Sequence, residues 1–295
     1  MIELVIAVLR TATPMIYVAM AGVLAQRAGV WNLGLEGLMI AGACAGVVIT
    51  AQTGSVVLGL AGAVLLGMLL SALLWLVIEK LRANPIIAGL GLTGLGLGGT
   101  DFAVQAVYGS EGAVTSPAGI PTLGPAFGAF GELDLLVLAM PLMVFAIWFL
   151  CRRTRFGLRL AASGEHPFAA RSVGADPARM RLIALLLGGV LAGLGGADLS
   201  LGGLDIFSVG MTAGRGFMAF SAVIFGAGHP LGATLATLFF ALVEFLGIKA
   251  QIVFGDRVPR NLVLMLPYIA TVLGIWISSR FHGTALTSSA EMRDG

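Results

Sequence analysis

RRTRFGLRLAASGEHPFAARSVGADPARMR, residues 152–181, is the stretch that decides how this chain is arranged. It carries seven arginines, whereas the stretches on either side of it, 133–151 and 181–203, are long apolar runs. An apolar run of roughly 20 residues can cross a hydrocarbon core of about 30 Å as a helix. Short loops rich in Lys and Arg between such helices lie on the cytoplasmic side. The stretch therefore predicts a cytoplasmic loop, and with it the orientation of the whole chain.

Composition assigns the chain to the membrane proteins. Hydrophobic residues make up 58% of its 295 residues and charged residues 11%, with a mean hydropathy of +0.99. One soluble core cannot bury that much apolar surface. The net charge of +2 is small, so no general basic surface indicates nucleic acid as a partner. The two cysteines, Cys44 and Cys151, lack CxxC spacing, which favours buried thiols over a disulfide or a metal site.

Apolar windows long enough to span a bilayer occur eight times along the chain. They cover residues 4–26, 33–52, 55–78, 85–107, 133–151, 181–203, 231–249 and 261–279. A ninth apolar piece, 216–228, is shorter, and it predicts either a short tilted span or a re-entrant helix. The expected fold is an all-α polytopic membrane protein with eight or nine transmembrane helices.

The loops give a topology. If residues 152–181 are cytoplasmic, residues 108–132 lie outside the cell, which agrees with their lack of Lys and Arg. The Gly, Pro, Ser and Thr residues of this external loop favour turns. The N-terminus then lies outside, but placing the C-terminus inside requires that 216–228 cross the membrane. We expect one transmembrane domain over residues 1–281, followed by a polar tail at 282–295.

Two stretches of the chain are faintly alike. GVWNLGLEGLMIAGA (29–43) and GRGFMAFSAVIFGAG (214–228) each start beside glycine and continue with apolar and small residues. Transporters are often built from two similar halves of opposite topology, with substrate handled where the halves meet. An inverted repeat is therefore one reading of the similarity.

Inside the cytoplasmic loop, breaks in the chain outline a short helix. Gly164 and Pro167 interrupt the chain and Gly174 follows, so a helix is expected over 167–173. Asp176 and Pro177 suit the N-cap and first position of the next helix, which enters the membrane. The short helix is either a docking element or a solvated loop element without a partner.

The loop sequence RxxxFGLRLAASGEHPFAARSVGAD, from residue 152, closely resembles the cytoplasmic segment of ABC importer permeases for nucleosides, simple sugars and branched-chain amino acids. RAGVWNLGLEGLMIAGA (27–43) resembles the ERSGVVNIGLEGMML block of the same permeases. Further blocks resemble the family in the expected order, namely ANPIIAGLGL (83–92), GRGFMAFSAVIFGAGHPLGA (214–233) and MLPYIATVL (265–273). The resemblance covers most of the chain. The NxGxEG pattern at 32–37 is most similar to the smaller of the two permeases in purine nucleoside uptake systems.

The resemblance implies a subunit of a multi-component importer in the inner or plasma membrane. Such an importer has two membrane subunits, two ATPase subunits and an extracytoplasmic binding protein that delivers the substrate. A second, homologous permease is the favoured membrane partner, which makes a heterodimer. The chain has no GxxxxGK[ST] phosphate loop, so ATP and Mg²⁺ are expected on the partner ATPase and no cofactor on this chain.

The resemblance also implies which residues contact the ATPase. Residues 165–176 correspond to a coupling helix that sits in a groove of the ATPase, so that closure of the ATPase dimer rocks the attached helices. The residues implied are Arg155, Arg159, Glu165, His166, Pro167, Ala170, Arg171, Gly174 and Asp176. For the three arginines, contact with membrane lipid and control of topology are alternatives.

Polar side chains within the apolar windows suggest a substrate pathway, because buried polar groups are costly in a membrane. Asn32 and Glu36 lie one helical turn apart, and Trp31 beside them has a ring that can stack on a base or sugar. Alternatively, Glu36 pairs with Arg27 or with a partner helix and serves packing. The candidate pathway residues are Trp31, Asn32, Glu36, Asn84, Thr93, Asp101, Gln105 and Phe217.

Other functions remain open at this point. A secondary transporter driven by an ion gradient also explains glycine-interrupted spans and buried carboxylates, and it would work from this chain alone. A membrane enzyme is disfavoured, because the sequence shows no partnered nucleophile, no HExxH and no aspartate-rich metal motif. No catalytic residue and no metal site is therefore expected. Within the importers, a simple sugar or a branched-chain amino acid is the alternative substrate.

Overall fold

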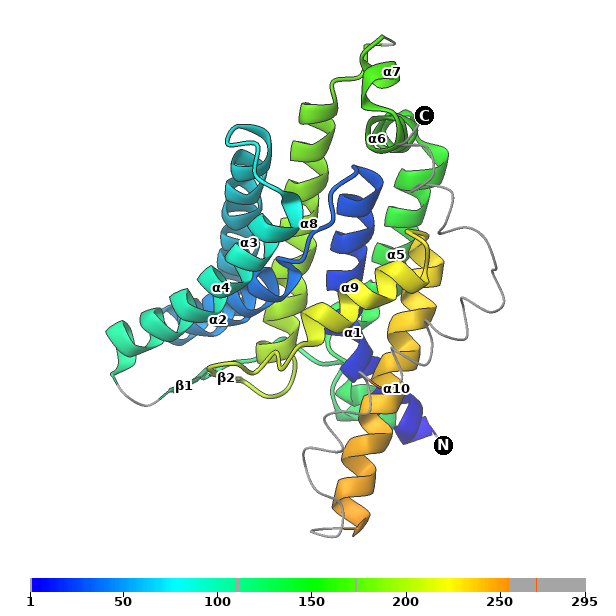
Figure 1. The fold of residues 1–295 in the computed structure, drawn as a ribbon. Coiled ribbons are helices and arrows are strands. Elements are labelled where there is room, and N and C mark those ends of the chain that lie inside the picture. The colour runs from blue at the N-terminus through cyan, green and yellow to red at the C-terminus, as the bar shows by residue number, and fades with distance from the viewer. Residues whose placement is uncertain (1, 110–111, 173, 255–268, 270–295) are drawn as a thin grey trace. The chain divides into compact units, whose positions relative to one another are not determined.

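The computed structural model describes residues 2–109, 112–172, 174–254 and 269 (Figure 1). Its elements in chain order are α1 (Ile2–Arg27), α2 (Leu35–Thr53), α3 (Val56–Glu79), α4 (Pro85–Tyr108), β1 (Ala113–Thr115), η1 (Pro125–Glu132), α5 (Leu135–Arg153), α6 (Arg155–Glu165), α7 (Pro167–Ser172), α8 (Pro177–Leu201), β2 (Ile206–Ser208), α9 (Arg215–Phe225) and α10 (Pro230–Phe254). The chain forms two compact units, residues 1–242 and 243–295, and the tertiary contacts below lie within the first.

Within the described part of the chain, seven helices are long and apolar enough to cross a membrane. These are α1, α2, α3, α4, α5, α8 and α10. They coincide with the first seven apolar windows of the sequence, which confirms the all-α polytopic fold. The eighth window, 261–279, lies outside the described residues except for Ile269.

The ninth apolar piece forms α9, which has only 11 residues. A helix of that length reaches about 16 Å, roughly half of a hydrocarbon core of about 30 Å. α9 is therefore too short to cross a bilayer by itself. Of the two arrangements that the sequence allows for 216–228, the length of α9 favours the re-entrant one over the short tilted span.

The centre of the first unit is α8, which packs against α1, α2 and α3. Glycines on α8 let the neighbouring backbones come close. A Cβ atom at Gly193 would overlap the carbonyl oxygen of Ala63 on α3, and one at Gly42 on α2 would lie 2.6 Å from the carbonyl oxygen of Gly193. Membrane helices associate through such small residues, because lipid leaves no hydrophobic force to drive them together.

The two ends of α8 carry different structures (Figure 1). Its first residue follows the α6–α7 segment, and its last residue precedes β2. At the β2 end, β1 pairs antiparallel with β2, and Val114 lies opposite Phe207. The described residues from 112 to 132 thus form a short strand, turns and the 3₁₀ helix η1, in agreement with the turn-rich sequence.

The α6–α7 segment contains one helix more than expected. The helix expected over 167–173 corresponds to α7, but α6 precedes it with 11 residues. The interruption expected at Gly164 was wrong, because this residue lies inside α6, where it packs against the backbone of Gly29. Thr154 begins α6, and its hydroxyl accepts a hydrogen bond from the Gly157 N–H at 3.2 Å. Gly157 lies against the carbonyl groups of Leu150 and Cys151, so this glycine serves close packing and does not end the helix. The expected N-cap of α8 is confirmed, since Asp176 Oδ1 accepts from the Ala178 N–H at 3.0 Å.

Candidate functional site

The carboxylate of Glu36 lies where α2 and α9 both begin. Glu36 Oε1 accepts hydrogen bonds from the Thr212 hydroxyl at 2.6 Å and from the Gly214 N–H at 3.0 Å. Its Oε2 accepts one from the Gly216 N–H at 2.6 Å, and the residue is only 3% exposed. We call this set, Glu36 with Thr212, Gly214 and Gly216, the helix-start junction.

The junction satisfies two needs at once. The first N–H groups of a helix have no partner within that helix and carry the positive end of its dipole. Gly214 is the N-cap of α9, with φ +84°, and has no side chain that could accept from those N–H groups. A buried carboxylate in turn requires hydrogen bonds to offset its lost hydration. Glu36 on α2 therefore acts as the cap of α9.

Two of the other candidate pathway residues hold the chain that leads into α2. Asn32 is 4% exposed, and its Oδ1 accepts from the Gly34 N–H at 2.9 Å, which shapes the turn before the helix. Thr93, in the middle of α4, donates its hydroxyl proton to the Leu33 carbonyl at 3.0 Å. α4 thereby supports the interrupted start of α2.

Trp31 contributes an aromatic surface beside the junction. It is 44% exposed, although it lies between two buried residues, Val30 and Asn32. Its ring contacts Phe220 of α9 edge to face, with centroids 6.2 Å apart. Phe217, one turn earlier on α9, is half-buried and directly follows Gly216 of the junction. The start of α2 and the start of α9 thus share aromatic side chains as well as the Glu36 contacts.

The remaining candidates on α4 lie away from Thr93. Asn84 is exposed and caps the first turn of α4, where its Oδ1 accepts from the Ile86 N–H at 2.9 Å. Asp101 and Gln105 lie in the last turns of α4, and Gln105 Nε2 donates to Asp101 Oδ1 at 3.2 Å. The structure therefore brings Trp31, Asn32, Glu36, Thr93 and Phe217 together around the starts of α2 and α9, and it does not bring Asn84, Asp101 or Gln105 there.

The residues predicted for the ATPase contact lie mostly on the surface of the α6–α7 segment. Exposed on it are Arg155, Arg159, Glu165, His166, Arg171, Gly174 and Asp176, whereas Pro167 is half-buried and Ala170 buried. The carbonyl of Ala170 accepts from the Ala175 N–H at 2.9 Å, which closes the turn after α7, and both α6 and α7 contact α8. Asp176 is committed to capping α8 and to an exposed ion pair with Arg179 at 3.7 Å. The segment thus presents mixed charges on a backbone that is anchored to α8.

Phe168 is a surface residue that the sequence analysis missed. It lies on α7 and is 85% exposed, more than any other large hydrophobic side chain of the described residues. A phenylalanine between the chain breaks at Pro167 and Gly174 was the available signal. Thr212, Gly214 and Gly216 were not predicted as site residues either. For Gly214 and Gly216, the similarity of 214–228 to 29–43 was the signal.

The end of the fold beside α6 has its own polar contacts. Arg27 donates to the carbonyl oxygen of Gly228 at 3.1 Å, and so not to Glu36 as one reading of the sequence had it. Arg181 on α8 donates to Glu79 Oε1 at 2.6 Å and to the Ala28 carbonyl at 3.2 Å. Of the two structural readings for Glu36, contact with a partner helix is the one that the structure supports.

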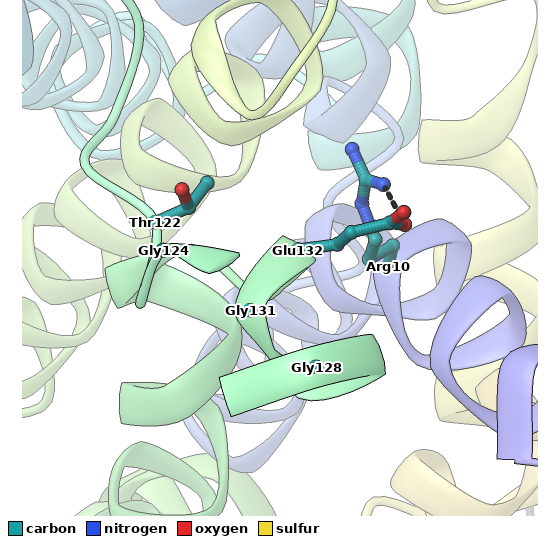
Figure 2. A pocket seen from close by; sticks show the side chains of 6 residues that line it. All are labelled: Arg10, Thr122, Gly124, Gly128, Gly131 and Glu132. Carbon is teal, nitrogen blue, oxygen red and sulfur yellow. Dashed lines mark hydrogen bonds and ion pairs between the residues drawn. The ribbon is translucent and has the colours of Figure 1, made fainter. Parts of the chain in front are cut away.

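An open pocket of about 450 Å³ lies at the other end, beside η1 (Figure 2). Arg10 of α1 and Glu132 form an ion pair across it at 3.3 Å. The rest of its lining is Thr122, Gly124, Gly128 and Gly131. Because Glu132 is 70% exposed in its side chain, the pair is worth little as a stabilising contact, and it marks instead where the loop between α4 and α5 meets α1.

Comparison with known proteins places the chain among transport proteins. Residues 4–275 match the model of a family described as the branched-chain amino acid transport system permease component. The guanosine ABC transporter permease protein NupQ of Bacillus subtilis is 35% identical, over 90% of this chain and 88% of its own length. The nucleoside ABC transporter permease protein NupC of Lactococcus lactis is 31% identical, over 95% and 92%. The putative glucose ABC transporter permease protein TsgC13 of Haloferax volcanii is 34% identical, over 83% and 77%. No solved structure is significantly similar to the chain.

Proposed function

Because the chain belongs to the family of branched-chain amino acid transport system permease components, we propose that it forms part of the pathway of a nucleoside importer. The chain is an ABC transporter permease, and its seven apolar helices make it a multi-pass protein of the plasma membrane. The helix-start junction is the observation that carries the proposal. ATP is hydrolysed by a separate ATPase subunit, which holds the nucleotide and its Mg²⁺.

The junction indicates where substrate passes. In many transporters, interrupted helices begin near the middle of the bilayer, and their N-terminal ends face the substrate. α2 begins at Leu35 after an irregular stretch, and α9 begins at Arg215, with Glu36 between the two starts. Trp31 is exposed beside them. A substrate that passes this point meets an aromatic ring and the polar backbone of residues 28–34.

The charge at the junction favours a neutral substrate. Free helix N-termini attract anionic groups such as the carboxylate of an amino acid. At α9 the N–H groups of Gly214 and Gly216 already donate to Glu36, so the protein supplies the anion itself. A nucleoside or a sugar carries no ionised group and needs no such site, whereas an amino acid is a zwitterion with a carboxylate. Branched-chain amino acids are therefore the least favoured of the three substrate classes.

Between the two neutral classes, the aromatic side chains favour the nucleoside. A planar base offers a face for stacking on Trp31, which already contacts Phe220 edge to face. Two of the relatives above are named for guanosine or nucleosides, and one for glucose. A sugar is therefore the second candidate, because sugars also pack on aromatic rings.

The α6–α7 segment is the proposed contact with the ATPase. Arg155, Arg159 and Arg171 are exposed there, and they suit acidic groups on a partner. Phe168 suits an apolar pocket, since large exposed aromatic residues commonly anchor protein interfaces. We propose that Phe168 is the anchor and that the arginines, with Glu165 and His166, surround it. Closure of the ATPase dimer then moves α6 and α7 against the membrane helices.

The remaining assembly follows from the orientation. The arginine-rich α6–α7 segment is placed in the cytoplasm, which puts residues 108–132 and the Arg10–Glu132 pocket outside, on the side of a substrate-binding protein. A second, homologous permease completes the pathway. A transmembrane domain over residues 1–281 is part of the proposal, and the polar tail predicted at 282–295 lies outside the described residues.

Co-purification of the tagged chain from its native membrane, followed by mass spectrometry, tests this proposal first. An ATPase, a homologous permease and a nucleoside-binding protein are the expected companions. Uptake into proteoliposomes should then require ATP and be blocked by unlabelled nucleoside more strongly than by glucose or leucine. A chain that purifies alone and transports down an ion gradient without ATP would instead be a secondary transporter.

A further inference from the structure

The turn formed by Arg27, Ala28 and Gly29, which ends α1, is in contact with several elements that lie far apart in the sequence. We call these three residues the α1 turn. Gly29 has φ +77° and lies backbone to backbone against Gly164 of α6. A Cβ atom at Gly164 would lie 2.8 Å from the Gly29 amide nitrogen and would overlap the Arg27 carbonyl oxygen. Because both residues are glycine, no flexible side chain separates the two backbones.

Two arginines fasten the same turn to other helices. Arg181 of α8 donates through Nε to the Ala28 carbonyl at 3.2 Å, while its Nη1 binds Glu79 at the end of α3 at 2.6 Å. Arg27 itself donates to the carbonyl of Gly228, just after α9, at 3.1 Å. It also reaches the carbonyl of Cys151 in α5 at 3.5 Å. The α1 turn is therefore held by α5, α6, α8 and the end of α9.

The chain leads from this turn directly to the proposed pathway. Trp31 follows Gly29 by two residues, and Glu36, with its contacts to the start of α9, follows by seven. Asn32 stiffens the link through its hydrogen bond to Gly34, and Thr93 holds Leu33. Because residues 30–34 are held by these hydrogen bonds, a shift of the α1 turn also shifts the start of α2.

We propose that the α1 turn transmits motion of α6 to Trp31 and the helix-start junction, and that the Gly29–Gly164 contact is the point of transmission. This inference rests on the proposed function, in which α6 and α7 move with the ATPase. Packed backbones do not compress, so a displacement of α6 displaces Gly29. Such interfaces switch between discrete arrangements and can amplify a small shift. Gly164, Gly29 and Arg181 are therefore positioning residues, which act on the pathway without touching substrate.

The test uses the whole complex with its ATPase in proteoliposomes and compares Gly164→Ala with wild type. The added methyl group pushes the α1 turn away from α6 and changes how motion is passed on. Ser163→Ala is the matched control, because Ser163 is the neighbouring residue of α6, is buried, and has no hydrogen-bond partner for its hydroxyl among the described residues. Uptake and ATP hydrolysis are measured on the same vesicles, and bound ATPase is quantified by gel.

Gly164→Ala is expected to raise the ATP hydrolysed per nucleoside transported by about 2- to 30-fold, the range seen for residues along coupling networks, with the ATPase still bound. Ser163→Ala is expected to keep the wild-type ratio. If Gly164→Ala does not assemble, Arg181→Lys tests the proposal in its place. Lys keeps a positive charge opposite Glu79 but lacks the Nε–H that donates to the Ala28 carbonyl. Its ratio should rise in the same direction.

The outcomes separate this inference from the proposed function. A wild-type complex without ATP-dependent uptake would overturn the proposed function. Suppose instead that the wild-type complex is coupled, but Gly164→Ala, or Arg181→Lys in its place, hydrolyses no more ATP per nucleoside transported than Ser163→Ala. This result would overturn the transmission role alone.

Discussion

The Glu36 carboxylate and the Thr212 hydroxyl lie 2.6 Å apart, although 176 positions separate them in the chain. The contact joins the start of α2 to the chain just before α9. Glu36 lies within the stretch 29–43, and the similar stretch 214–228 begins two residues after Thr212. An inverted repeat remains a prediction, but the two similar stretches do meet at their first helical turns. The junction therefore ties together two parts of the chain that no local signal connects.

Replacing Glu36 should destabilise the fold. Glu36→Ala leaves the Thr212 hydroxyl and the N–H groups of Gly214 and Gly216 buried without their acceptor, which costs about 3 kcal/mol or more. Glu36→Gln keeps one acceptor oxygen and should cost about half as much. Thermal unfolding in detergent measures this, with an expected drop in apparent melting temperature of roughly 6–12 °C for the alanine variant. Equal melting of all three proteins would contradict the capping role.

Close packing around α8 predicts a second effect. Gly193→Ala places a methyl group against the carbonyl oxygen of Ala63, and overpacking of this kind costs about 1–3 kcal/mol. The variant should melt earlier or express at a lower level. Gly94→Ala is the control, because its added Cβ meets nothing within 4 Å. Fluorescence-detected size-exclusion chromatography after heating measures the stability of both variants. If Gly94→Ala lowers stability as much as Gly193→Ala does, the close glycine contacts of α8 do not explain the effect.

Phe168 should matter for assembly and not for folding. It is 85% exposed, so Phe168→Ala removes little buried area from the chain itself. If it anchors the ATPase, its loss should weaken binding by about 30-fold, as for an interface residue worth roughly 2 kcal/mol. Binding of the ATPase to the permease in nanodiscs measures this. Ser172→Ala, at an exposed position of the same helix, should bind as wild type. If Phe168→Ala binds the ATPase with wild-type affinity, Phe168 is not the anchor of this interface.

Trp31 should distinguish nucleosides from other substrates. Stacking of a base on an aromatic ring is worth about 1–3 kcal/mol, so Trp31→Ala should lower the maximal nucleoside uptake about tenfold or more. Trp31→Phe keeps an aromatic face and should retain most of the uptake. The measurement is ATP-dependent uptake at saturating binding protein. An alanine variant with wild-type uptake would show that the ring, although 44% exposed, serves packing against Phe220.

Local sequence signals predicted the helices well but misjudged some interruptions. The windows for α1 to α5, α8 and α10 were right, since a long apolar run has one stable form in a bilayer. α6 was missed because Gly164 was taken as an interruption, whereas in the structure this glycine lies inside α6 and packs against the backbone of Arg27 and Gly29. A glycine that allows close packing and a glycine that ends a helix look the same in the sequence. Only its neighbours in space distinguish the two.

The sequence by itself determined the class of protein, the spanning helices and the family. Hydropathy and charge act locally along the chain, and family blocks are read from the chain directly. Which polar residues work together was decided by the tertiary structure alone. Sequence spacing grouped Asn84, Asp101 and Gln105 with Thr93 on one helix, but only Thr93 lies against the chain that leads into α2. Glu36 finds its three donors on a segment that begins 176 residues later, because a buried carboxylate and a bare helix start each need what the other supplies.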